Sequence, residues 1–96
     1  MIVNIHNAEG KRILTIVDDN LIGQKISENG LQLDLSSDFY KGEKRTEEEI
    51  EKLVPRSYIM HLVGKKSVAW GIKNNIVEKD KIIAIKNIPH AEVVFL

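Results

Sequence analysis

The sequence predicts a single small α+β domain in which a mostly antiparallel sheet packs on helices. Its 96 residues are enough for one domain, and 43% hydrophobic residues is typical of globular proteins rather than disordered chains. Apolar, β-like runs stand towards both ends of the chain, and a polar, helix-forming stretch lies between them. The predicted elements follow the order β-β-α-β-α-α-β-β, which favours the α+β class.

The first third of the chain predicts a hairpin, a short helix and a strand. Residues 2–6 and 12–17 have the pattern of strands, and turn-forming residues join them. The polar side chains of residues 18–20 can cap a helix, and Asn29-Gly30 supplies its terminator. Residues 31–35 alternate strictly between apolar and polar, which predicts a strand with one buried face.

The middle of the chain predicts two helices. Thr46 and Glu49 match a capping box, in which each side chain bonds the backbone N–H of the other residue. This helix ends near Pro55, because the residue before a proline is pushed out of helical geometry. A second helix is expected over residues 57–75. It contains two glycines, so close backbone packing or a bend near Gly64 is expected.

Two strands, residues 81–86 and 91–96, close the chain around a turn that carries a histidine. The turn is Asn87-Ile88-Pro89-His90-Ala91, which places His90 at its tip. Pro89 fixes φ in this turn, and its peptide bond could be cis or trans. Two interpretations of His90 follow: the ring bonds a backbone group and stabilises the turn, or it contacts a ligand or partner.

Composition excludes several functional classes. The chain has no cysteine, which removes disulfides, thiolate catalysis and cysteine-based metal sites. Its 14 basic residues balance 14 acidic residues, which disfavours binding of nucleic acid by bulk charge alone. No apolar run reaches the roughly 20 residues that span a bilayer, and the N-terminus lacks the features of a signal peptide. A cytoplasmic protein without a membrane partner is therefore expected.

Nucleotide-binding motifs are absent from the sequence. Gly64-Lys65 resembles the end of a P-loop, but the glycine five residues earlier and the Ser or Thr after the lysine are missing. The glycines are too widely spaced for a dinucleotide-binding fingerprint. The sequence therefore predicts no cofactor.

Three histidines raise the question of a metal site. His6, His61 and His90 could form one together with Glu43 or Glu92. They fall on three different predicted elements, however, and no i,i+4 or H-x-H spacing joins them. We therefore expect no metal ion.

Three blocks together resemble a known family. They are Phe39-Tyr40-Lys41-Gly42-Glu43, Leu62-Val63-Gly64-Lys65-Lys66-Ser67-Val68-Ala69 and Ile88-Pro89-His90-Ala91-Glu92. In this order the blocks resemble the archaeal family of domains of unknown function numbered 424, and the similarity extends to Leu21-Ile22-Gly23-Gln24-Lys25. The chain departs from the family pattern at Met60-His61, where a small residue and Asn are expected, and at Asn87, where Gly is usual. The resemblance implies a small archaeal α+β domain and no particular activity.

The loop around Tyr40 and the two lysines after Gly64 each have two interpretations. The aromatic pair at 39–40 could close the edge of a small core, with Gly42 at a positive φ. Alternatively, Tyr40 could stack on a base while neighbouring basic residues contact phosphates, as single-stranded RNA recognition requires. Lys65 and Lys66 form either a solvated helix face or a nucleic-acid contact.

Three functions remain open from the sequence. The favoured one is a non-catalytic binding module for RNA or a translation-related ribonucleoprotein complex. The residues expected to bind are Tyr40, Gly42, Glu43, Gly64, Lys65, Lys66, Pro89 and His90. The alternative is a small enzyme in which His90 is the general acid or base, Glu43 orients it, and Tyr40 or Lys65 binds an anionic substrate. A further alternative is a homodimer formed through an edge strand at residues 91–96.

Overall fold

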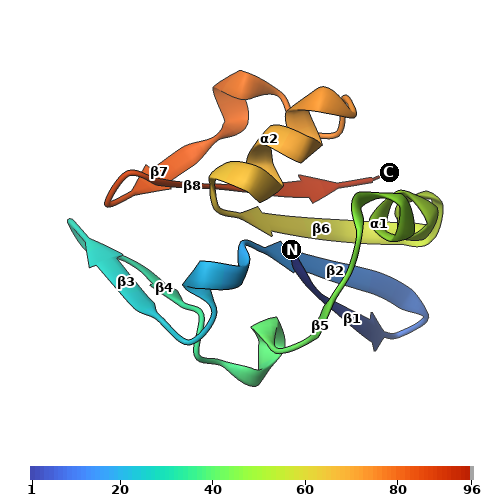
Figure 1. The fold of residues 1–96 in the computed structure, drawn as a ribbon, viewed down its shortest axis with the longest axis horizontal. Helices are drawn as coiled ribbons and strands as arrows, with labels where there is room; N and C mark the ends of the chain where they lie inside the picture. The colour runs from blue at the N-terminus through green and yellow to red at the C-terminus, as the bar shows by residue number, and fades with distance from the viewer. Residues whose placement is uncertain (96) are drawn as a thin grey trace.

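A six-stranded sheet runs through the molecule (Figure 1). Its strands are β1 (Ile2–Ala8), β2 (Lys11–Val17), β5 (Glu43–Lys44), β6 (Ser57–Val63), β7 (Ile83–Ile85) and β8 (Ile88–Val94). The computed structural model describes residues 1–95, and the strand order in this sheet is β5-β1-β2-β6-β8-β7. Neighbouring strands are antiparallel except β2 and β6, which run parallel. The predicted α+β class with a mostly antiparallel sheet is therefore confirmed.

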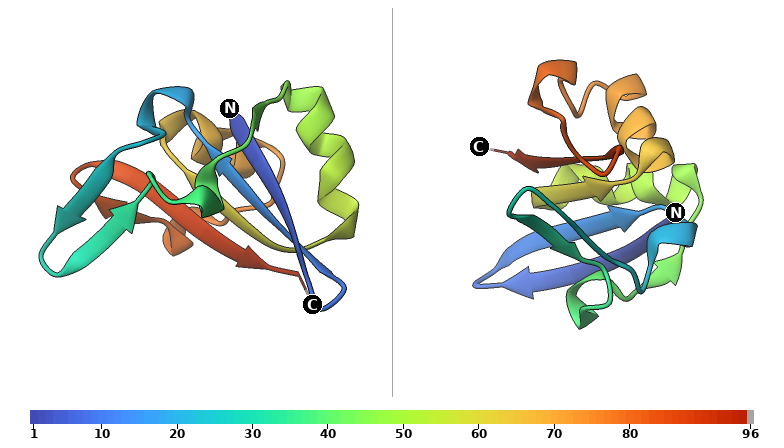
Figure 2. Two further views of the ribbon diagram at one scale, coloured as in Figure 1. Left: turned by 90° about the horizontal axis from the view of Figure 1, so that it is seen from below. Right: turned by 90° about the vertical axis from the view of Figure 1, so that its left-hand side faces the viewer.

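A small hairpin and two helices complete the fold. The hairpin consists of β3 (Lys25–Glu28) and β4 (Leu31–Asp34), and the helices are α1 (Glu47–Leu53) and α2 (Lys65–Lys73). Figures 1 and 2 show the hairpin at the opposite end of the molecule from α1. No helix in residues 1–95 is both long enough and apolar enough to cross a membrane.

The sheet is buried on both faces, but by different elements. On one face the two helices cover the larger apolar core, to which they contribute Ile50, Val68 and Trp70. The sheet residues of this core are Val3, Leu14, Ile16, Met60, Leu62 and Ala91. On the other face the β3–β4 hairpin and Tyr40 cover a smaller core that includes Val17, Val63 and Ile85. Successive residues of β2 and β6 therefore face different cores, as the two-residue period of a strand requires.

Several local predictions are confirmed. The first two strands form a hairpin, and its turn residues Glu9 and Gly10 have positive φ values of 52° and 78°. The capping box of α1 is present: the Thr46 N–H donates to Glu49 Oε1 at 3.0 Å, and the Glu49 N–H donates to Thr46 Oγ1 at 3.2 Å. Gly71 packs closely inside α2, since a Cβ there would lie 2.9 Å from Leu62 Cδ2.

The helix predicted after residues 18–20 is wrong. Only a 3-10 turn forms at Asp19–Leu21, and the chain then enters β3, which pairs with β4. Asn29-Gly30 does not end a helix. The two residues have φ values of 50° and 83° and form the two-residue turn of the β3–β4 hairpin.

The second helix was expected to start at residue 57, but α2 starts eight residues later, at Lys65. Residues 57–63 form β6, in which Met60 and Leu62 point into the core beneath the helices. Gly64 is not inside a helix but precedes α2 with a φ of 107°. The β-branched and aromatic residues of this segment suit a strand, and pairing on both sides, with β2 and β8, satisfies its backbone.

The prediction of His90 at the tip of a turn is also wrong. The β7–β8 turn consists of Lys86 and Asn87, which have φ values of 49° and 63°. His90 lies within β8, opposite Val63 of β6 and Ile83 of β7. The peptide bond before Pro89 is trans.

The predicted last strand is only partly an edge. Strand β8 pairs with β6 along residues 90–94 and with β7 along residues 88–90, so its outer side is unpaired over residues 91–94 within the described chain. Val93 and Phe95 pack against the larger core, and Val94 is 47% exposed. Leu96, which the sequence places in this strand, lies outside the described residues.

Candidate functional site

The strongest candidate site lies where the parallel strands β2 and β6 end. Asp18 follows the last residue of β2, and Gly64 follows the last residue of β6. Their backbones meet there, because the Asp18 N–H donates to the Val63 carbonyl at 3.0 Å. The carboxyl ends of parallel strands are a common place for ligand sites in sheets that also carry helices.

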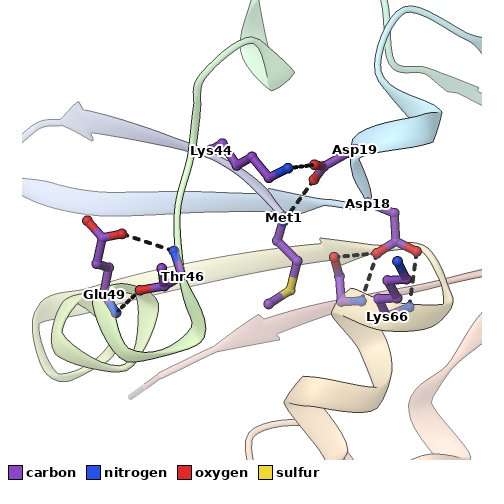
Figure 3. Close-up of polar contacts among 8 residues, drawn as sticks. Met1, Asp18, Asp19, Lys44, Thr46, Glu49 and Lys66 are labelled. Atoms are coloured by element: carbon purple, nitrogen blue, oxygen red, sulfur yellow. Dashed lines mark hydrogen bonds and ion pairs between the residues drawn. The ribbon is translucent and has the colours of Figure 1, made fainter.

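Asp18 ties this end of β2 to the start of α2. One carboxylate oxygen, Oδ2, accepts from the Lys66 N–H at 3.0 Å. The other, Oδ1, accepts from the Ser67 N–H at 2.8 Å and from the Ser67 hydroxyl at 2.7 Å. Figure 3 shows the Asp18 side chain pointing towards the start of α2. Asp18 therefore caps a helix 48 residues away in sequence, although the sequence suggested that it would cap a helix beginning at its own position.

Gly64 is required at this junction for two reasons. Its φ of 107° is a conformation that residues with a Cβ rarely adopt, and a Cβ at this position would collide with the Asp18 carboxylate. Its N–H donates to the Pro89 carbonyl at 2.8 Å. This one residue therefore brings together the ends of β2 and β6 and the beginning of β8.

The neighbouring carboxylate, Asp19, points away from α2 and has different partners (Figure 3). It binds the N-terminal amino group of Met1 at 2.8 Å and Lys44 Nζ at 3.1 Å. Hydrogen bonds from these two cationic groups lower the Asp19 pKa from 3.8 to about 2. Both acidic side chains at the end of β2 are therefore already engaged with groups of this chain.

A cleft of about 760 Å³ opens beside these residues, and four lysines line it: Lys44, Lys65, Lys66 and Lys86. We call it the lysine cleft. Pro89, Asn87 and Ile88 from the β7–β8 connection form part of its wall. Lys65, Lys66 and Lys86 are exposed and form no ion pair with any other described residue. The cleft therefore has positive charge that the neighbouring carboxylates do not neutralise.

A second group of candidate residues lies on the sheet face opposite the helices. The 3-10 turn Asp38–Tyr40 covers this face, and the Phe39 carbonyl interacts with Asn4, His6 and Thr15. Phe39 stacks on His6 with ring centroids 4.5 Å apart. The Tyr40 hydroxyl lies 3.2 Å from His61 Nδ1, and the His61 ring meets the His90 ring edge-on at 5.8 Å. The three histidines thus lie along one face, although they come from three strands. We call His6, Phe39, Tyr40, His61 and His90 the histidine row.

Burial is the main cause of the shifted pKa values of His61, His90 and Tyr40. Burial lowers the pKa of His61, the charge of a protonated His90 lowers it further, and Glu92 opposes both effects. Burial also lowers the pKa of His90, again against the effect of Glu92. Burial raises the pKa of Tyr40, and the charge of Glu92 adds to the increase. Tyr40 is only 9% exposed, so its ring packs against the smaller core and is not free to stack on a base.

Glu43 does not reach His90. It lies in β5, and the strands β1, β2 and β6 separate β5 from β8. Glu43 instead pairs with Arg45 at 3.3 Å and is largely exposed. Gly42 lacks the expected positive φ; a Cβ there would collide with the Val3 carbonyl, so close approach to β1 is what requires glycine. Within residues 1–95, no three His, Asp or Glu side chains are grouped as metal ligands.

The structure thus divides the residues that the sequence singled out. It brings Lys65, Lys66 and Pro89 together at the lysine cleft, with Gly64 bonded to Pro89 beside it, while Tyr40 and His90 lie in the histidine row. Among the basic residues that follow Tyr40, which the sequence suggested as phosphate contacts, Lys44 lines the cleft. The sequence analysis missed Asp18 as a distant helix cap and Lys86 as a member of the cleft. No local signal identifies these residues, because each reaches the site only through strand pairing.

The fold and the cleft define a small α+β protein with a basic cleft at the end of its parallel strands. The chain belongs to the family described as "Protein of unknown function (DUF424)", whose model matches residues 6–96. It is similar in fold to the crystal structure of an uncharacterized conserved protein from Methanopyrus kandleri, with a TM-score of 0.83 and 20% sequence identity. That match covers 99% of this chain and 90% of the other. A search of curated proteins finds no similar sequence.

Proposed function

We propose that this chain is a non-catalytic RNA-binding module whose lysine cleft holds the RNA phosphate backbone. The observation that supports the proposal is the convergence of Lys65, Lys66 and Lys86 on one cleft. Asp18 and Asp19, the acidic side chains beside them, are occupied by the start of α2 and by Met1 and Lys44. Positive charge therefore remains for an external anion, although the whole chain is neutral.

The chemistry of the cleft favours a polymer backbone over a tightly held mononucleotide. Tight phosphate sites use the free backbone N–H groups at a helix N-terminus. At the start of α2, the Asp18 carboxylate already accepts from the N–H groups of Lys66 and Ser67. A phosphate would therefore meet flexible lysine side chains, the kind of contact that positions a nucleic-acid backbone without reading its sequence. The volume of about 760 Å³ suits a nucleotide-sized segment.

The proposed RNA-binding surface contains fewer residues than the set that the sequence suggested. The lysine cleft includes Lys65, Lys66 and Pro89, whereas Tyr40 and His90 do not line it. Gly64 supports the cleft from beside it, through its contact with Asp18 and its bond to the Pro89 carbonyl. We place the partner RNA in a cytoplasmic ribonucleoprotein complex, such as one of the translation apparatus. A chain without cysteines suits a reducing compartment of this kind.

Binding of a labelled single-stranded RNA, followed by fluorescence anisotropy, tests the proposal. The triple variant Lys65→Ala, Lys66→Ala, Lys86→Ala should bind at least about tenfold more weakly than the wild type, because three phosphate contacts are lost. The matched control is Lys52→Ala, Lys79→Ala, Lys81→Ala, which removes the same charge from exposed positions outside the cleft. Equal affinities for the two triple variants would contradict the proposal.

The identity of the partner can be tested in a lysate of the source organism. The tagged protein is sedimented through a gradient with and without ribonuclease treatment, and co-migrating molecules are identified. We expect migration with ribonucleoprotein particles that is lost after ribonuclease. Migration as a free small protein in both gradients would contradict a stable ribonucleoprotein partner.

A further inference from the structure

A second hollow adjoins the lysine cleft along the side of α2. Its volume is about 490 Å³. The two cavities share Met1 and Lys66, so they adjoin near the start of the helix, and we call the two together the groove. The remaining residues that line this second cavity, which we call the helix hollow, are Arg45, Thr46, Glu47, Ala69, Trp70 and Lys73.

One face of α2 forms a wall of the helix hollow. Lys66, Ala69, Trp70 and Lys73 follow the spacing of residues that share a helix face. Lys73 lies seven residues after Lys66, which places their Cα atoms about 10 Å apart along the helix. Lys73 is exposed and forms no ion pair with another described residue. Four lysines, Lys65, Lys66, Lys73 and Lys86, therefore place positive charge along the groove, and Glu47 places one negative charge in the helix hollow.

Two buried hydrogen-bond donors of this hollow have no partner within the described chain. They are Trp70 Nε1, on a residue that is only 3% exposed, and Arg45 Nε. The Arg45 Nη atoms are engaged, since Nη2 lies 3.3 Å from Glu43 and Nη1 lies 3.6 Å from Glu49. Buried N–H groups without an acceptor are costly and uncommon in proteins. Both groups are donors only, so any partner that binds them supplies hydrogen-bond acceptors, as the oxygens of a nucleic-acid strand can.

We infer that the RNA bound by this chain is single-stranded and that it continues from the lysine cleft past Lys66 into the helix hollow. This inference rests on the RNA binding proposed above. In the hollow, phosphate oxygens meet Lys73, and oxygens of the strand accept from Arg45 Nε and Trp70 Nε1 after small adjustments of these side chains. A flexible single strand can follow two adjoining concave cavities, whereas a stiff duplex would bridge them.

Trp70 is the only tryptophan of the chain, so its fluorescence reports directly on the helix hollow. The wild-type protein is titrated with an RNA dinucleotide, a longer single strand and a duplex of the same length, and anisotropy of the labelled RNA is measured in parallel. We expect the longer single strand to bind more tightly than the dinucleotide or the duplex. Only the longer strand should change the Trp70 emission.

Two variants of the hollow keep Trp70 in place. Lys73→Ala removes its charge, and Ala69→Glu introduces an opposing charge at an exposed position of the same wall. Each should weaken binding of the longer strand at least about threefold and leave dinucleotide binding unchanged. Lys52→Ala is the control, since Lys52 is exposed on α1 and lines neither cavity. Circular dichroism confirms that each variant is folded before binding is compared.

The outcomes separate the two proposals. RNA binding with an unchanged Trp70 emission, and with Lys73→Ala equal to Lys52→Ala, would overturn the helix-hollow path and leave the lysine cleft as the RNA site. Equal binding of the duplex, with the same change in Trp70 emission, would overturn the assignment to a single strand. Failure of the wild type to bind any RNA would overturn both proposals.

Discussion

At the scale of single residues, two adjacent aspartates have different roles. Asp18 is 6% exposed and accepts three hydrogen bonds at the start of α2, whereas Asp19 pairs with Met1 and Lys44 nearer the surface. Asp18 lies between β2 and the 3-10 turn and Asp19 is the first residue of that turn, and their side chains point in different directions (Figure 3). As a result, the Asp18 carboxylate connects the end of β2 to the start of α2, and the Asp19 carboxylate connects it to Met1 and Lys44. Met1 and Lys44 offset the charge of Asp19, and Lys65, Lys66 and Lys86 outnumber Asp18 in the lysine cleft.

The histidine row makes stability depend on pH. The pKa values of His61 and His90 in the folded protein are both below the ordinary 6.5, mainly because of burial. The unfolded chain therefore takes up protons before the folded chain does, as pH falls through about 6.5. We expect the free energy of unfolding to be highest above this pH and to fall as the solution is acidified from about pH 7.5 to pH 5.

Urea unfolding at several pH values measures this effect. The groups that face the two rings are Tyr40, Glu92 and Ile83, and of these Glu92 opposes the loss by favouring the protonated rings. The double variant His61→Gln, His90→Gln should lose most of the pH dependence. His6→Gln serves as the control, because it leaves both rings in place. A wild-type free energy of unfolding that rises on acidification would contradict the lowered pKa values of His61 and His90.

At the scale of elements, the parallel pairing of β2 and β6 creates the site. Parallel strands place their carboxyl ends at the same edge of the sheet, and here those ends carry Asp18 and Gly64. Strand β8 joins them through the bond from the Gly64 N–H to the Pro89 carbonyl. The lysines that follow Gly64 thereby enter the same cleft as the β7–β8 connection.

Gly64→Ala tests this junction. Alanine would have to adopt a positive φ of 107°, which residues with a Cβ rarely do. Its Cβ would also collide with the Asp18 carboxylate and displace the cap of α2. We expect a loss of about 2 to 4 kcal/mol in the free energy of unfolding, measured by urea denaturation.

Gly10→Ala is the matched control for this substitution. Gly10 also has a positive φ, of 78°, but nothing lies within 4 Å of its added Cβ. It should lose only about 1 kcal/mol, the cost of the backbone conformation alone. Equal losses for the two variants would show that contact with Asp18 does not matter at position 64.

At the scale of the whole molecule, a neutral chain has an uneven distribution of charge. Its 14 acidic residues match its 14 basic residues, yet five lysines and Arg45 line the groove against three acidic residues, Asp18, Asp19 and Glu47. Total charge therefore says little about the anion-binding capacity of one face. The RNA binding proposed above therefore depends on the local charge of the groove, and we expect it to weaken as the salt concentration rises.

Salt dependence provides a quantitative prediction. Contacts from Lys65, Lys66 and Lys86 to three phosphates of a single strand predict a slope of about −2 for log K against log salt concentration. A roughly threefold increase in salt should then weaken binding about tenfold. Lys65→Ala should reduce the steepness of this slope by about 0.7, and Lys52→Ala should leave it unchanged. A slope near zero in anisotropy titrations would contradict phosphate contact.

Local signals in the sequence were sufficient for some elements and misleading for others. The capping box of α1 and the β1–β2 hairpin are confirmed because the residues that determine them are neighbours in the chain. The segment after Asp18 forms a 3-10 turn and β3, although Leu21, Ile22 and Ile26 also have the spacing of one helical face. The Asn29-Gly30 dipeptide was the better signal, since it forms a hairpin turn there.

Segment 57–63 shows why periodicity alone was insufficient. Its apolar residues fit a helical face, but the same residues fit a strand that is buried on both faces. Pairing with β2 and β8 decided between the two, and those partners lie more than 25 residues away in sequence. The position of His90 depended on a similar choice, because a two-residue turn at Lys86 and Asn87 leaves it inside a strand.

The sequence by itself determined the α+β class and the family. These follow from composition, local pattern and motif, which need no knowledge of distant contacts. Only the tertiary structure decided that Asp18 caps α2, that Lys44 and Lys86 join the cleft, and that Glu43 lies far from His90. The physical reason is that the order of strands in a sheet sets which distant residues meet, and that order depends on packing across the whole molecule.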